Sequence, residues 1–131
     1  MPLVLAMLAL GGCAAMDAPS CPAGTSAMPT AELFFGRNIG SEIGVSEDDW
    51  RTFLAEEVTP RFPAGLSVTD VAGQWRDADG TIVREPSKAL FLVLSGGPGE
   101  AERIEAIREA YKTRFGQHGV MLVRGRACVS F

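Results

Sequence analysis

Alternating and continuous apolar segments divide the chain into a few elements, and the clearest pattern lies in residues 66–94. Residues 69–75 contain the β-branched, small and aromatic side chains that favour a half-buried strand. The Asp-Ala-Asp-Gly sequence that follows favours a chain reversal, because Gly80 can adopt the positive φ of a hairpin turn. The apolar run at residues 89–94 is typical of a buried strand. We therefore predict a long β-hairpin, with Pro86 at a bulge or beyond the end of a neighbouring strand.

Similar patterns predict the other elements. Residues 32–39 are predicted to form a strand with apolar side chains on both faces. A helix is predicted from Ser46, where Asp49 completes a capping box, to the position before Pro60. After a Gly-Gly-Pro-Gly connector, a second helix is expected to end at Gly116, and a last extended segment follows.

The resulting order is β-α-β-β-α-β, which predicts an α+β, ferredoxin-like domain. In this fold two helices cover one face of a four-stranded antiparallel sheet. Its first and third strands are central, and these are the most apolar segments of the chain. The opposite face must then be polar, covered by a loop, or buried against a partner.

The N-terminal residues resemble an export signal. A short apolar stretch at residues 3–10 precedes Gly11, Gly12 and Cys13, a pattern similar to the lipobox of bacterial lipoproteins. We predict a signal peptide at residues 1–12, a lipid on Cys13 that anchors the protein to a membrane, and a flexible tether at residues 13–30. A single domain is predicted at residues 31–131, in the bacterial cell envelope and facing the periplasm.

The N-terminal pattern leaves alternatives open. No Lys or Arg precedes the apolar stretch, so the true start of the protein could lie upstream of Met1. The alternatives are an ordinary secretory signal, with a secreted protein as the result, or a buried N-terminal helix.

The other two cysteines, Cys21 and Cys128, predict a disulfide, because an even number of cysteines in an exported protein favours pairing. The alternative is two free, buried thiols. No metal site is predicted, since two distant cysteines and one histidine fall short of the usual four zinc ligands. No cofactor is predicted.

The length of 131 residues allows one domain with a substantial core. The formal net charge of −4 argues against nucleic-acid binding, which requires a basic surface.

Most of the unusual polar side chains are expected on or near the uncovered sheet face, with Glu32, Asp70 and Glu85 interspersed. The candidate ligand-binding residues are Arg37, Gln74, Trp75, Arg76, Arg84 and Lys88. Guanidinium groups bind carboxylate or phosphate in pairs of hydrogen bonds, and Trp75 offers a surface for stacking. The simpler interpretation is a solvated sheet face with weak cross-strand ion pairs.

No catalytic set is recognisable. His118 is the sole histidine and is expected in a turn, with no nucleophile at a motif spacing. The primary hypothesis is therefore a non-catalytic binding module for a small anionic ligand or an envelope protein. The alternative is a small enzyme in which two sheets pack face to face as a homodimer around an anionic substrate.

Several segments together resemble a bacterial family known as domain of unknown function 3574 (DUF3574). They are residues 32–37, 58–63 with 65–66, 73–77, 82–85 with 87–88, 110–112 with 114–115, and 127–131. The resemblance covers residues 21–131 and implies small exported or lipid-anchored proteins, without an activity. It marks Gln74, Trp75, Arg76, Arg84 and Lys88 as positions of the family motifs.

Overall fold

The computed structural model describes residues 20–131, so the predicted signal peptide and Cys13 lie outside the described residues. A four-stranded antiparallel sheet has the order β4-β5-β1-β6. Its strands are β1 (Ser26–Gly36), β4 (Ser67–Arg76), β5 (Ile82–Val93) and β6 (Met121–Val129). The other elements are the small hairpin of β2 (Asn38–Ile39) and β3 (Glu42–Ile43), helix α1 (Glu47–Phe53) with its π-helical extension η1 (Leu54–Val58), and helix α2 (Glu100–Phe115).

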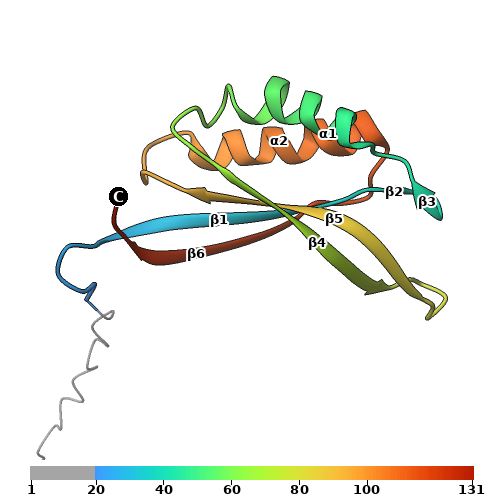
Figure 1. Cartoon of the computed structure of the whole chain (residues 1–131), viewed down its shortest axis with the longest axis horizontal. Coiled ribbons are helices and arrows are strands. Elements are labelled where there is room, and N and C mark those ends of the chain that lie inside the picture. Colours follow the sequence, from blue (N-terminus) through green and yellow to red (C-terminus); the bar gives the residue numbers. More distant parts are fainter. Residues whose placement is uncertain (1–19) are drawn as a thin grey trace, which may run out of the picture.

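The helices lie on one face of the sheet, and no helix of residues 20–131 covers the other (Figure 1). The two central strands are β1 and β5. The ferredoxin-like prediction is therefore confirmed. None of the helices in this part of the chain is long and apolar enough to cross a membrane.

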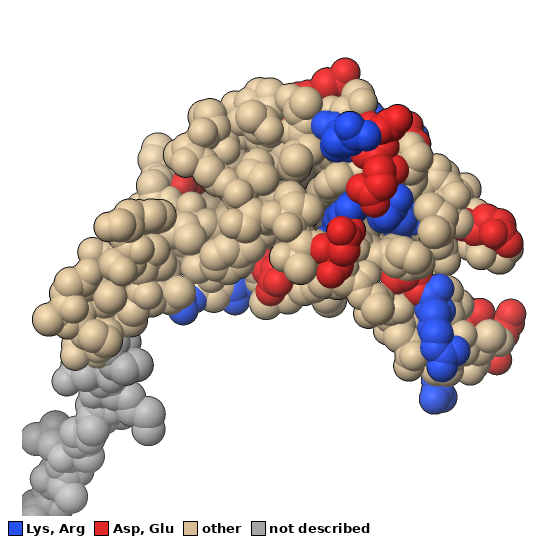
Figure 2. Space-filling model, viewed as in Figure 1, with Lys and Arg blue, Asp and Glu red and all other residues tan. Residues whose placement is uncertain are grey.

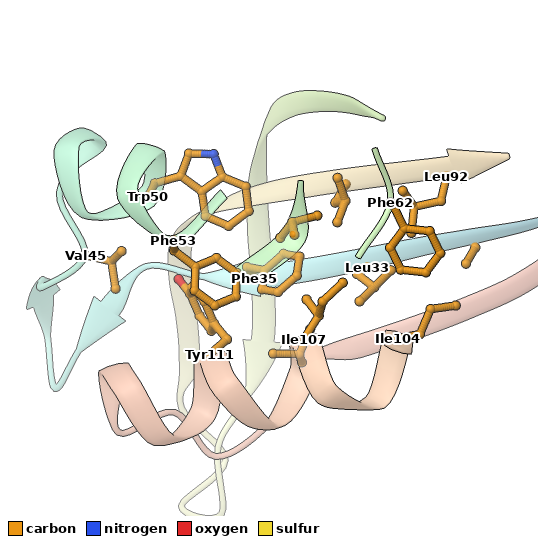
Figure 3. Close-up of a cluster of buried hydrophobic side chains, with 14 of the residues drawn as sticks. Leu33, Phe35, Val45, Trp50, Phe53, Phe62, Leu92, Ile104, Ile107 and Tyr111 are labelled. Carbon is orange, nitrogen blue, oxygen red and sulfur yellow. The ribbon is translucent and has the colours of Figure 1, made fainter. Parts of the chain in front are cut away.

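The core fills the space between the helices and the sheet. Phe35 of β1 packs against Trp50 and Phe53 of α1 and against Tyr111 of α2 (Figure 3). Helix α1 begins at the predicted capping box, in which Ser46 accepts from the backbone N–H of Asp49 and the Asp49 carboxylate accepts from that of Ser46. The Ser46 hydrogen bonds also lower the pKa of Asp49.

The β4–β5 hairpin agrees with its prediction. Asp77 and Thr81 close the turn with a backbone hydrogen bond of 3.0 Å, and Gly80 has a φ of 85°. Pro86 lies just beyond the last pair between β1 and β5, Gly36 with Ser87, so its missing N–H removes no hydrogen bond to β1.

The start of the domain differs from the prediction. Strand β1 begins at Ser26, which pairs with Val129 of β6, so the predicted tether is wrong for residues 26–30. The predicted disulfide between Cys21 and Cys128 is present, with the two Cα atoms 5.4 Å apart. It fixes the start of β1 beside the end of β6. Residues 26–30 have no alternating pattern of apolar side chains, so their pairing with β6, and not local preference, makes them a strand.

Candidate ligand-binding pocket

A concave pocket of about 740 Å³ lies on the uncovered face of the sheet, where β1 ends. Its walls come from the β4–β5 hairpin, from β2 and from the loop at residues 116–119 between α2 and β6. The side chains that define it are Phe34, Trp75, Glu85, Gln117, His118 and Met121. The hairpin curls away from the helices, and the molecule is hollowed on this side (Figures 1 and 2).

Glu85 is held in one position at this pocket. One carboxylate oxygen, Oε1, accepts from the backbone N–H of Asn38 at 2.9 Å, and Oε2 accepts from the Trp75 indole N–H at 3.3 Å. The carboxylate lies directly over Gly36, where a Cβ atom would come within 2.5 Å of Oε1. The absence of a side chain at position 36 therefore creates the space that Glu85 occupies.

The segment that carries these contacts is fixed from the other side by α2 and the loop after it. The buried Tyr111 hydroxyl donates to the carbonyl of Gly36 at 2.8 Å, and the Gln117 side chain donates to the carbonyl of Asn38 at 2.7 Å. Burial raises the pKa of Tyr111 above its ordinary value of 10.0, so its phenol remains a donor at alkaline as well as at neutral pH. The end of β1 is thus rigidly positioned beneath the pocket.

The predicted placement of the basic residues on the uncovered face is wrong. Gln74 of β4 pairs with Arg84 of β5, and Lys88 of β5 pairs with Phe35 of β1, which is buried in the core. Directly paired residues point to the same face, and every second residue shares it. Arg76, Arg84 and Lys88 therefore share a face as predicted, but it is the face that carries the helices. Trp75 alternates with Gln74 and Arg76 along β4, so its side chain lies on the uncovered face, and 50% of its surface is exposed.

Two of the predicted ligand-binding cations are already paired. Arg37 donates from Nε to the carbonyl of Val45 at 2.9 Å and from Nη1 to Glu47 at 2.6 Å. The buried Lys88 ammonium donates to Glu47 at 2.9 Å and to Asp70. These side chains connect the start of α1 to the end of β1 and to the middle of β4 and β5. Acidic and basic side chains accordingly gather beside α1 (Figure 2).

The pKa values of the groups in this cluster reflect the same contacts. The hydrogen bond from Lys88 is the main cause that lowers the pKa of both Glu47 and Asp70. Burial by itself lowers the pKa of Lys88, but the hydrogen bonds and charges of Asp70 and Glu47 outweigh this and raise it. The cluster is internally neutralised and is poorly suited to bind a further anion.

The remaining candidates are separated from one another. Gln74 and Arg84 line a hollow of about 570 Å³ along the hairpin, where Asp70 and Glu85 are also present. Arg76 is exposed near the hairpin tip and lines neither hollow. Only Gln74 and Trp75 of the six predicted residues line the larger pocket.

Sequence reasoning did not select five of the side chains that define the pocket, namely Phe34, Glu85, Gln117, His118 and Met121. His118 was expected in a turn and is there, exposed, but its loop forms one wall of the pocket. The alternation of side chains along a strand could have identified Glu85. It is at an odd-numbered position of β5, whereas the other charged residues of this strand, Arg84 and Lys88, are at even-numbered positions and point to the opposite face. The register of the hairpin, in which Trp75 pairs with Val83, places Glu85 on the same face as Trp75.

The connector before α2 is occupied by its own helix, because the Glu100 carboxylate accepts from the backbone N–H groups of Ser95 and Gly96 at 2.8 and 3.0 Å. Within residues 20–131, no three His, Cys, Asp or Glu side chains come together as a possible metal site.

Comparison with protein families confirms the resemblance inferred from the motifs. Residues 30–131 match the family described as protein of unknown function (DUF3574). The chain belongs to this family. A comparison with curated proteins finds no match.

Solved structures show the same fold at low sequence identity. A phage SAM lyase in complex with S-methyl-5′-thioadenosine is similar with a TM-score of 0.61 and 17% identity, over 90% of this chain and 97% of that chain. The phage SAM lyase in its apo state has a TM-score of 0.60 and 15% identity, over 88% and 97% of the two chains. CutA from Synechococcus elongatus PCC7942 has a TM-score of 0.51 and 12% identity, over 80% of each chain. At this identity the similarity establishes the fold of this DUF3574 member, and not its activity.

Proposed function

We propose that the protein is a small-molecule binding module whose site is the pocket between Trp75, Glu85 and the 116–119 loop. The observation that carries the proposal is the fixed Glu85 carboxylate in a concave pocket of about 740 Å³. Ligand sites are typically concave and mostly apolar, with a few polar groups in defined positions, and this volume is within their usual range. The basic residues, which supported an anionic ligand, lie elsewhere, and that part of the hypothesis is withdrawn.

A thermal-shift screen of the purified protein tests the proposal. The panel contains small metabolites of positive, zero and negative charge. It includes S-methyl-5′-thioadenosine, because a protein of the same fold has been solved with it. A ligand at about a hundred times its dissociation constant adds roughly 2.7 kcal/mol to the free energy of unfolding, which raises Tm by several degrees.

The location of binding is tested with two variants of neighbouring residues on opposite faces. Trp75→Ala removes a wall of the pocket and is expected to abolish the shift. Arg76→Ala changes the adjacent, exposed residue outside the pocket and is expected to preserve it. A ligand that still binds to Trp75→Ala contradicts this site, and a panel without any hit favours a protein partner.

An enzymatic function is the second candidate, and one observation favours it. Glu85 and His118 both line the pocket, and carboxylate and imidazole are the groups most used for general acid–base catalysis. Each compound that binds should then be followed for conversion by mass spectrometry. Conversion that His118→Ala abolishes without loss of binding supports an enzyme, whereas unchanged compounds support a binding module.

A homodimer through the uncovered sheet face remains a prediction. Phe91, Met121 and Val123 leave 39%, 57% and 47% of their surface exposed on this face, which a second copy could bury. Sedimentation equilibrium measures the mass in solution, and Val123→Lys is expected to dissociate such a dimer. A monomer at high protein concentration rules it out.

We also propose that the protein is exported and anchored in the cell envelope through a lipid on Cys13. The disulfide supports an oxidising compartment, where such bonds persist. Intact-mass measurement of the membrane fraction tests the anchor. A species that begins at Cys13 and carries a diacylglycerol supports it, whereas one that retains Met1 without lipid contradicts it.

A further inference from the structure

The charge of the pocket is set by a single side chain. Among the described residues that line it, Glu85 is the sole acidic one, and none is Lys or Arg. The remaining polar side-chain groups are amides, a hydroxyl, the Trp75 indole N–H and the His118 imidazole. A ligand in this pocket therefore meets one fixed carboxylate, with no fixed cation among those residues to balance it.

The Glu85 carboxylate retains capacity to accept hydrogen bonds from a ligand. Each oxygen accepts one hydrogen bond from the protein, from Asn38 to Oε1 and from Trp75 to Oε2. An ionised carboxylate can accept about four, so roughly half of its capacity remains. The two protein donors and Gly36 beneath hold the group in place before a ligand arrives, which reduces the ordering cost of binding.

Two aromatic side chains stand beside this carboxylate. Trp75 is half exposed and Phe34 half-buried, and both line the pocket. Trp75 is doubly suited, because its indole N–H donates to Glu85 while its ring remains available to a ligand. Aromatic faces attract cations through the ring quadrupole, and tryptophan does so most strongly. A carboxylate and aromatic rings together form a typical recognition site for organic cations.

We propose that the pocket selects a small organic cation, an ammonium or similar group on an apolar or aromatic body, with Glu85 as the residue that determines the charge preference. This inference rests on the proposed function, since it concerns the ligand class of the same pocket. It reverses the sign of the ligand expected from the sequence.

Three probes with one skeleton test the charge preference. They are 2-phenylethylammonium, 2-phenylethanol and phenylacetate, which present a cation, a neutral hydroxyl and an anion on a phenyl group. Binding is followed by NMR at the indole N–H of Trp75, assigned with Trp75→Phe. Because hydrogen bonds to charged groups are about twice as strong as neutral ones, the ammonium is expected to bind roughly tenfold more tightly than the alcohol. Phenylacetate is expected to bind most weakly.

Glu85→Gln identifies the origin of the preference. The amide keeps the size of the side chain and can still accept from Asn38, so the fold is expected to persist. The ammonium should lose roughly tenfold in affinity, while the alcohol changes little. Glu32→Gln is the matched control, because it removes the same charge from the same sheet face outside the pocket lining. It should leave both affinities unchanged.

The outcomes separate the inference from the proposal on which it rests. If the alcohol binds wild type as tightly as the ammonium, or if Glu85→Gln leaves their ratio unchanged, the cation preference is wrong and the pocket remains. If neither these probes nor the metabolite panel shifts the Trp75 resonance, the binding function itself is wrong, and this inference with it.

Discussion

The carboxylate of Glu85 occupies the space above Gly36, with its Oε1 atom 2.5 Å from where a Cβ at position 36 would be. This contact joins the central strands β1 and β5 on the uncovered face. It depends on the smallest residue on one strand and a charged residue on the other. The pocket proposed as a ligand site is built around this pair.

Gly36→Ala is expected to displace the Glu85 side chain and break its hydrogen bonds from Asn38 and Trp75. The chain end of Glu85 can move, so the loss of stability should be modest, about 1–2 kcal/mol for the broken contacts. NMR should show a shifted Trp75 indole N–H and weaker binding of 2-phenylethylammonium. Gly119→Ala is the control for stability alone, because its added Cβ meets no atom within 4 Å but the residue lies in the pocket wall. An unshifted Trp75 resonance in Gly36→Ala contradicts the prediction.

Tyr111→Phe removes the hydroxyl that donates to the carbonyl of Gly36 and leaves that carbonyl without this donor. We expect a loss of about 1–3 kcal/mol in the free energy of unfolding, measured by urea denaturation at neutral pH. A variant as stable as wild type would show that the hydrogen bond contributes nothing.

The same variant tests a dependence on alkaline pH. Burial raises the pKa of Tyr111 above its ordinary value of 10.0, so its contribution is fully present below that pH and is lost as pH rises further. Wild type should therefore lose more stability in alkali than Tyr111→Phe. Tyr111 is the sole tyrosine, so phenolate absorbance reports its ionisation directly. Ionisation of the folded protein at the ordinary pKa would contradict the buried state.

Lys88→Met keeps the buried alkyl chain and removes the ammonium that holds Glu47 and Asp70. Both carboxyls have a lowered pKa in the folded state, so their contribution is present above their ordinary values of 4.5 and 3.8 and is lost as pH falls through the lowered values. The variant should therefore lose less stability than wild type on acidification, measured by urea denaturation across this range.

A matched control for this change is Lys112→Met, which removes an exposed pair with Glu109 on α2. It should follow the acid dependence of wild type, because surface pairs contribute little. Equal acid sensitivity of Lys88→Met and wild type would show that the Lys88 cluster does not couple folding to protonation.

Removal of the disulfide between Cys21 and Cys128 should be strongly destabilising. The bond joins residues separated by 107 positions, and the loop-entropy description gives roughly 4–5 kcal/mol for a loop of this length. Cys21→Ser with Cys128→Ser should show this loss in urea, and reductant should reproduce it in wild type. Thiols at both positions that react with a maleimide in denaturant without prior reduction would contradict the bond.

Features with a local cause could be predicted from the sequence. The capping box of Ser46 and Asp49 and the hairpin turn at Gly80 depend on residues that are neighbours in the chain. Their hydrogen bonds and dihedral angles follow from those residues alone. The order of strands and helices followed from the same local patterns, and with it the ferredoxin-like fold.

Features that depend on contacts between segments far apart in the chain could not be predicted from the local sequence. Ser26 is in a strand because β6 offers it a partner about a hundred residues later, and nothing in the adjacent sequence indicates this. The hydrogen bond from Gln117 to Asn38 likewise joins distant segments, so the 116–119 loop was not recognised as a pocket wall.

The period of two along β4 and β5 determined from sequence alone that Gln74, Arg84 and Lys88 share one face. The tertiary structure decided which face the helices cover, because that depends on which side chains of β1 and β5 pack against α1 and α2. Lys88 is therefore directed toward the start of α1, and the arginines of the hairpin lie on the same side. Glu85 and Trp75, on the opposite side, form the pocket. The alternation of side chains along a strand specifies which residues share a face of the sheet. Only the packing of the helices on the sheet specifies whether that face is covered or open.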